Sequence, residues 1–286
     1  MVKTRSSKKR TKKEAASEAL SKAQECELLR ISTLLLLIID NLTLYEFVTF
    51  DNSLTNKIIR YQYKGLITNR YCPYGLNVYL HNRVSLSYCL KNFYCKDLIA
   101  LNFKFGVEDN DISNILTSSL LPLNNIETLH FTYCDLLSDN IISNIIQGCP
   151  NVTAIDLSGA LNTGTRTISV LSTITVAKNL EELHLSQIKN ISNFSVNNIL
   201  QSAYKLRILN LSWTFGVSDA VLVTIGNKLK LLQVLLMISQ HDISEIGVRN
   251  LCDTIITLKE IHLDYCRQIS IRFINELKDK GIKASV

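Results

Sequence analysis

A six-residue pattern with apolar residues at its first, fourth and sixth positions returns seven times along the chain. It constrains the fold more than any other feature. The fourth, central residues of the seven units are Leu101, Leu129, Ile155, Leu183, Leu209, Leu235 and Ile261, spaced by 28, 26, 28, 26, 26 and 26 residues. A period of this size indicates a stack of structural repeats, in which each unit buries its apolar face against the next.

Each unit has the parts of a strand followed by a helix. Its alternating apolar residues have the period of a short strand with one buried face. Nine residues after most central residues stands a residue type that favours a helix N-cap: Asn110, Ser138, Ser192, Ser218, Ser244 and Ser270. Several are followed by an acid that suits the helix dipole, namely Asp111, Asp139, Asp219 and Glu245. Apolar pairs four residues apart, such as Ile141 with Ile145 and Val221 with Ile225, then face the core.

Stacking these units predicts an α/β solenoid over residues 95–286, with a curved parallel sheet on the inner, concave side and helices outside. The third unit departs from the rule, since Gly164 stands where the others have a cap residue. We therefore expect its helix to start late.

The units resemble the cysteine-containing leucine-rich repeat of F-box-type proteins. Cys149-Pro150-Asn151-Val152 matches the opening of that repeat, Cys134 and Cys266 match its second cysteine, and Leu137-Ser138-Asp139 and Val217-Ser218-Asp219 match its closing turn. The resemblance implies a ribonuclease-inhibitor-like solenoid that recognises substrates for a ubiquitin ligase.

The first 13 residues form a basic tail. Seven Lys or Arg residues precede the first acid, Glu14, so the rest of the chain is near neutral although the whole carries +6. The tail is either a nuclear address or a disordered, solubilising arm, and the body gives no support to nucleic-acid binding. We expect the protein in the cytoplasm, the nucleus or both.

Residues 14–66 predict helices, with a capping box at Thr43 and Glu46. Part of this segment resembles a degenerate F-box, although it lacks the family's Leu-Pro start and its Trp. The resemblance implies docking on a Skp-type adaptor and cullin through Leu35, Leu36, Ile38, Ile39, Leu42 and Phe47. The alternative is a helical cap on the end of the solenoid. Residues 67–94 predict an irregular connector, with room for one atypical repeat.

Motifs for catalysis or cofactors are absent: nucleophile elbows, phosphate loops, HExxH, EF-hand spacings and zinc-ligand cysteine pairs. The apolar run 34–39 is too short to span a bilayer. His130, Asp156 and His184 share one strand position and could hold a metal or perform acid–base chemistry, but an open sheet face lacks a water-excluding pocket. We expect no enzyme activity, no cofactor and no metal.

The same inward column predicts a surface for a protein partner. It comprises Asn102, His130, Asp156, His184, Asn210, Leu236 and His262, with Lys104, Thr132, Ser158, Ser186, Ser212, Ile238 and Asp264 beside it. Aromatic residues recur at the rim, as Phe105, Tyr133, Trp213 and Tyr265. Leu236 and Ile238 predict an exposed apolar patch.

The preferred interpretation is a substrate-recognition subunit of a Skp-cullin-F-box ubiquitin ligase, acting as a monomer within that complex and holding its target on the concave face. The alternative is a leucine-rich-repeat scaffold that works without a ligase. Neither needs a membrane or a nucleic acid.

Overall fold

The computed structural model describes residues 76–78, 100–103, 107–110, 112, 123–189 and 191–285. The predicted basic tail, the helical segment 14–66 with its adaptor-binding residues, and the side chains of Lys104, Phe105 and Asp111 lie outside the described residues. Within the described ranges, no helix combines the length and apolar content needed to cross a membrane.

The described strands form one sheet in which every strand pairs in parallel with its neighbours in the sequence. The strands are β1 (Leu76–Val78), β2 (Ala100–Phe103), β3 (Thr128–His130), β4 (Ala154–Asp156), β5 (Glu182–His184), β6 (Ile208–Asn210), β7 (Val234–Leu236), β8 (Glu260–His262) and β9 (Lys283–Ser285). Strands β2 to β8 are those of the seven predicted units. Strand β1 lies in the predicted connector, and β9 follows the last unit.

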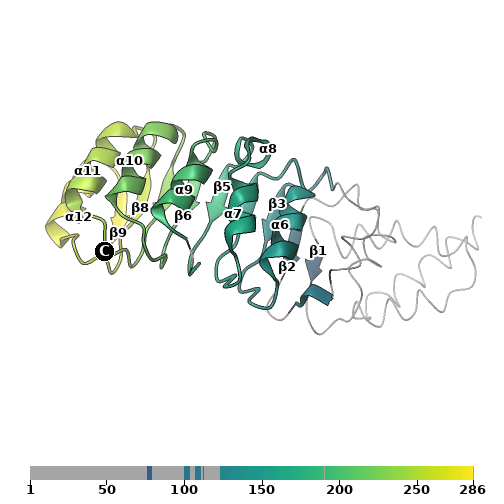
Figure 1. The fold of residues 1–286 in the computed structure, drawn as a ribbon. Coiled ribbons are helices and arrows are strands. Elements are labelled where there is room, and N and C mark those ends of the chain that lie inside the picture. Colours follow the sequence, from purple (N-terminus) through teal and green to yellow (C-terminus); the bar gives the residue numbers. More distant parts are fainter. Residues whose placement is uncertain are drawn as a thin grey trace, which may run out of the picture. The chain divides into compact units, whose positions relative to one another are not determined.

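From β3 to β9, helices connect consecutive strands and lie in a row along one face of the sheet (Figure 1). They are α6 (Asp139–Gln147), α7 (Thr165–Leu171), α8 (Ile174–Ala177), α9 (Asn193–Leu200), α10 (Asp219–Lys228), α11 (Glu245–Thr254) and α12 (Ile271–Asp279). The repeating strand-and-helix unit confirms the predicted fold, an α/β leucine-rich-repeat solenoid.

The core is a ladder of equivalent residues. The central residues of all seven units pair with one another in register, from Leu101 to Ile261, and each is at most 1% exposed. In the first two units the sixth residues, Phe103 and Phe131, stack with ring centroids 4.9 Å apart. The apolar pairs predicted on α6 and α10 are buried as well. Each strand is therefore stabilised by burial against the next repeat.

All five predicted serine caps occupy the N-cap position of their helices. Four of them, Ser138, Ser192, Ser244 and Ser270, accept a hydrogen bond from a backbone amide of the first turn. Asn110 is different, because it lies inside a helical turn that already includes Asp109. The prediction that Asn110 is an N-cap was therefore wrong, because the residue lies within the helical turn and not before it.

The residues that open the helices, four acids and Asn193, also form bonds to the next repeat. The first residue of a helix accepts a hydrogen bond from the backbone amide of the N-cap residue in the next repeat. Five such bonds, of 2.8 to 3.0 Å, join Asp109 to Ser138, Asp139 to Gly164, Asn193 to Ser218, Asp219 to Ser244 and Glu245 to Ser270. We call this series the cap ladder; it ties the helix starts of adjacent repeats together.

The cap ladder explains why the prediction for the third unit was wrong. Helix α7 begins directly after Gly164, in the same register as the other helices. The carboxylate of Asp139 replaces the missing hydroxyl and accepts from the amides of Gly164, Arg166 and Thr167 at 2.9 to 3.0 Å. A Cβ atom on Gly164 would stand 2.9 Å from Asp139 Oδ2, so glycine leaves room for this neighbour.

Partial burial acts to raise the pKa of Asp139, but hydrogen bonds from Thr167, Gly164 and Arg166 outweigh it, and the pKa lies below its ordinary value. We therefore predict that Asp139→Ala lowers the free energy of unfolding by about 1–2 kcal/mol, because the start of α7 loses its acceptor. Urea denaturation followed by circular dichroism measures this. The control, Asp253→Ala, removes an exposed carboxylate paired with Lys280 and should cost less than about 0.5 kcal/mol. Equal losses would contradict the role of Asp139.

Candidate partner-binding face

The face of the sheet opposite the helices carries three columns of side chains, which we call the strand face. Relative to each central residue they stand one position before, one after and three after. The column after the central residue runs in register through Asn102, His130, Asp156, His184, Asn210, Leu236, His262 and Ser285. This is the predicted column, extended by β9. From Asn102 to Ser285 its members are partly exposed.

The predicted row of His130, Asp156 and His184 exists, but its two histidines have different carboxylate partners. His130 Nδ1 lies 3.8 Å from Asp156 Oδ2. His184 instead pairs through Nε2 with Glu182 Oε1 at 2.6 Å, on its own strand. Among the described residues, no cluster of three or more histidine, cysteine or acidic side chains has the arrangement of a metal site.

Asp156 is the most strongly stabilised carboxylate of the strand face. Its oxygens accept from Thr132 Oγ1 at 3.1 Å and from the Ser158 amide at 2.8 Å. Burial acts to raise the pKa of Asp156, but the nearby His130, the bonds from Ser158 and the charge of His184 lower it far more. The pKa of Asp156 therefore lies well below its ordinary value, and the side chain is an anion at neutral pH.

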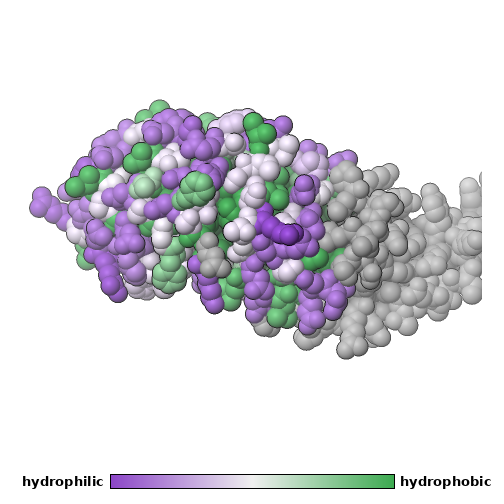
Figure 2. Space-filling model, viewed as in Figure 1, coloured by the Kyte–Doolittle hydropathy of each residue, from purple (hydrophilic) through white to green (hydrophobic). Residues whose placement is uncertain are grey.

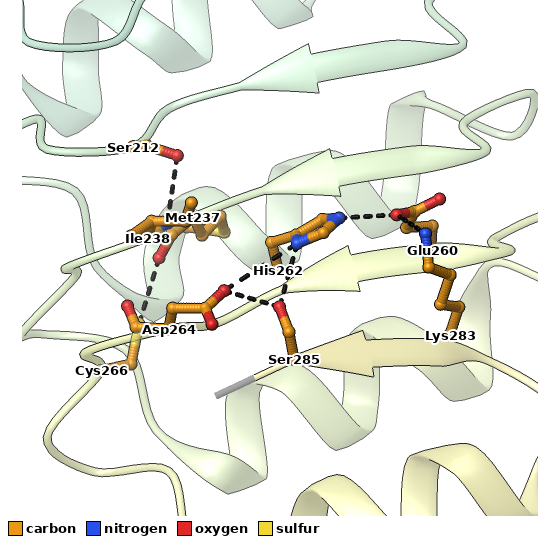
Figure 3. A network of polar contacts seen from close by, with 9 residues as sticks. All are labelled: Ser212, Met237, Ile238, Glu260, His262, Asp264, Cys266, Lys283 and Ser285. Atoms are coloured by element: carbon orange, nitrogen blue, oxygen red, sulfur yellow. Dashed lines mark hydrogen bonds and ion pairs between the residues drawn. The ribbon is translucent and has the colours of Figure 1, made fainter.

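A second polar network joins β8 to β9 (Figure 3). His262 lies between Glu260, at 2.7 Å from Nε2, and Ser285, at 2.9 Å from Nδ1. Ser285 donates to Asp264 Oδ2 at 2.6 Å, and Lys283 contacts Glu260 Oε1 at 2.6 Å. The hydroxyl of Ser285 is therefore already hydrogen-bonded to the carboxylate of Asp264. The network stabilises the pairing of β9, the last described strand, with β8.

Sequence reasoning missed the column before the central residue, which contributes Glu182 and Glu260. The period of two along a strand could have revealed both, because these positions share a face with His184 and His262. The repeat spacing did not indicate the β9 residues Lys283 and Ser285, because β9 follows β8 by a shorter interval than the other strands follow one another.

The rim residues, four positions after the central residue, adopt a left-handed backbone conformation in six successive units. Their φ angles lie between 56° and 70°, at Tyr133, Gly159, Gln187, Trp213, Ser239 and Tyr265. This conformation costs an ordinary L residue roughly 1–2 kcal/mol relative to glycine. Bulky aromatic residues are therefore unexpected at three of these positions.

The aromatic rim residues are exposed. Trp213 is 46% exposed and Tyr265 is 74% exposed, and their ring centroids lie 6.4 Å apart across the smaller Ser239 of the unit between them. Tyr133 lies over Gly159, where a Cβ atom would clash with its ring. Leu236 and Ile238, predicted as an exposed patch, are only partly exposed. The backbone amide of Ile238 donates to Ser212 Oγ at 3.1 Å.

Exposed apolar side chains occur along the helical side, and two of them, Val223 of α10 and Ile246 of α11, line the same pocket. Phe194, Val223, Ile246 and Ile271 are each more than 60% exposed, and they belong to four different helices. Figure 2 shows the apolar residues of this side interspersed with hydrophilic ones. At the rim, Trp213 and Tyr265 also lie close together, with their rings tilted by 45° to each other.

The described cysteines, Cys134, Cys149, Cys252 and Cys266, are free and buried, which agrees with structural thiols. Burial raises the pKa of Cys149 to about 12 and that of Cys252 to about 11. Cys266 donates its thiol to the carbonyl of Met237 at 3.1 Å.

Comparisons with known proteins found similarity among solved structures alone. No family model and no curated protein matches the sequence. Among solved structures, a chain of the crystal structure of the Rad7 and Elc1 complex in yeast is similar to this chain. It is 13% identical, with a TM-score of 0.44, and the match covers 99% of this chain and 98% of that one. The assignment of the repeat fold comes from the register and burial of the chain's own strands.

The environment of Asp156 predicts a specific pH dependence of stability. Because its pKa is lower in the folded protein than in the unfolded chain, its carboxylate stabilises the fold above about pH 4, and this contribution is lost as the pH falls toward the folded pKa. We expect the free energy of unfolding of Asp156→Asn to fall less steeply below pH 4 than that of the wild type. Urea titrations between pH 2 and pH 7 measure the slope. Glu181→Gln, which removes an exposed partner of Arg207, should keep the wild-type slope; a matching slope for Asp156→Asn would refute the assignment.

Proposed function

We propose that this chain is a protein-binding module whose strand face and aromatic rim hold a partner protein. The observation that carries the proposal is the presence of Trp213 and Tyr265, exposed and adjacent, at positions with a left-handed backbone. Such a conformation disfavours bulky side chains, and strained residues are common at binding sites. Large exposed aromatic residues are typical anchors of protein interfaces.

The alternative of a purely structural role for these rings has less support. Rings kept for stability would be expected to bury most of their surface, as Phe103 and Phe131 do. Trp213 and Tyr265 instead leave about half or more of theirs accessible. A partner that covers them would supply the apolar burial that offsets their conformational cost.

At the next level we propose a substrate-recognition subunit of a Skp-cullin-F-box type ubiquitin ligase, in the cytoplasm or nucleus. Its support is the resemblance of the repeats, and of residues 31–66, to F-box-type proteins. In this role the chain brings a target to a ligase, and none of its own residues need perform chemistry. The alternative is an interaction scaffold with the same strand face and no adaptor.

The rim is tested by the double variant Trp213→Asn with Tyr265→Asn. Because asparagine tolerates the left-handed conformation better than aromatic residues, we expect an unchanged or higher melting temperature. Partner capture should nevertheless fall at least about tenfold, as for loss of an interface anchor. Quantitative mass spectrometry of proteins crosslinked to the full chain measures capture.

The matched control is Phe194→Ser, which removes from α9 a ring as exposed as that of Tyr265 and should retain every partner. If no captured protein depends on Trp213 and Tyr265, the rim is not an interface.

The ligase role is tested by comparing the intact protein with a chain that begins at residue 67. A Skp-type adaptor and a cullin should co-purify with the intact chain alone, because the proposed adaptor residues precede residue 67. The full-length variant Leu42→Asp with Phe47→Asp should lose the adaptor as well. If the intact chain retains other partners but neither adaptor nor cullin, the ligase role is rejected and the interaction scaffold is the remaining interpretation.

A further inference from the structure

We infer that the part of the strand face between β5 and β9, with Trp213 and Tyr265 at its rim, binds a basic, extended segment of the partner protein through arginine and lysine side chains. The inference rests on the proposed function and adds the chemistry of the partner. It comes from three features of this surface: an apolar strip, a pair of exposed rings, and the sign of the surrounding charge.

The apolar strip lies in the middle of the surface. Leu236 stands in register between Asn210 and His262, and Ile238 comes two residues later on the same face. Both side chains are partly exposed. No helix among the described residues covers this face, since all of them lie on its opposite side (Figure 1). The strip therefore offers apolar contact to the stems of long side chains, which bury their methylene groups while the charged head stays outside.

The two rings border the strip on the rim side. Trp213 and Tyr265 belong to repeats on either side of Ser239, and their centroids lie 6.4 Å apart. Alternate side chains of an extended segment stand roughly 7 Å apart, so two of them match the separation of the rings. Aromatic faces attract the guanidinium of arginine and the ammonium of lysine.

The charge of the strand face selects among possible partners. Between β5 and β9 its described charged side chains, apart from the histidines, are the carboxylates Glu182, Glu260 and Asp264 and a single ammonium, that of Lys283. These carboxylates are 25% to 40% exposed and outnumber the ammonium three to one, so the formal charge of the surface apart from its histidines is negative. The whole chain has the opposite sign, +6 at pH 7. A basic segment is therefore attracted, while an acidic segment or a nucleic acid is repelled.

Arginine suits the surface particularly well. Asp264 directly precedes Tyr265 and keeps 30% of its side chain exposed, so a guanidinium could contact the carboxylate and the ring together. Glu182 is 40% exposed and offers a second carboxylate three strands away. The acids thus define the preferred partner, and the apolar strip and rings provide the contact area.

The chain offers its own reporter for the test. Trp213 is its single tryptophan, so a peptide without tryptophan that binds here changes the intrinsic emission of the full-length protein. The probe is a nine-residue peptide of alternating arginine and serine, and the comparison peptide has glutamate in place of arginine. We expect saturable binding of the basic peptide alone, weakened by salt.

The variant pair Glu182→Gln with Asp264→Asn should weaken binding about tenfold, the effect of removing two partly exposed charge contacts. The matched control, Asp253→Asn with Glu276→Gln, removes two carboxylates from the helical side and should change the affinity less than about twofold. Equal effects of the two pairs, or equal binding of both peptides, would overturn the inference.

Two further outcomes distinguish the possible failures. If deletion of residues 1–13 strengthens binding of the basic peptide tenfold, the chain's own basic tail occupies the surface, and the assignment to a partner is overturned. If the peptide does not bind but Trp213→Asn with Tyr265→Asn still loses captured proteins, the basic partner is wrong and the binding function stands. If the peptide does not bind and the double variant still captures every protein, both the basic partner and the binding function are refuted.

Discussion

The structure depends on the burial of one apolar residue per strand against the same residue of the neighbouring strand. A unit of about 26 residues cannot enclose a core of its own, and burying a side chain such as Leu209 contributes roughly 1.5–3 kcal/mol only where the next repeat covers it. In-register pairing from Leu101 to Ile261 keeps this ladder continuous. Helix position, rim geometry and the strand face all follow from that register.

The cap ladder is the polar counterpart of this core. Backbone amides at a helix start have no partner within the helix, and here many are satisfied by the preceding repeat as well as by the local serine. A single carboxylate can serve two donors: Asp219 accepts hydrogen bonds from both the amide and the hydroxyl of Ser244. Adjacent helices are thus joined by directional bonds as well as by apolar packing, which favours one spacing between repeats.

A parallel sheet usually has both faces covered, yet a solenoid has helices on only one. The polar side chains of the other face then find their hydrogen-bond partners in water, in one another or in a bound protein. In this chain some of them pair with one another, as His184 does with Glu182 and His262 with Glu260. Trp213 and Tyr265, in contrast, leave much of their apolar surface exposed to solvent. This contrast underlies the proposed binding role.

The sequence by itself determined the repeat, its strands, the serine caps and the column of inward residues, because these follow from local periodicity and from residue types with strong positional preferences. It also predicted Tyr133, Trp213 and Tyr265 at the rim, while the fourth aromatic residue, Phe105, lies outside the described residues. Only the tertiary structure decided the partners between repeats: Asp139 caps α7 across 25 residues, and β9 brings Lys283 and Ser285 to β8. Such contacts depend on distances of a few tenths of an ångström between units far apart in the chain, and a one-dimensional pattern does not contain them.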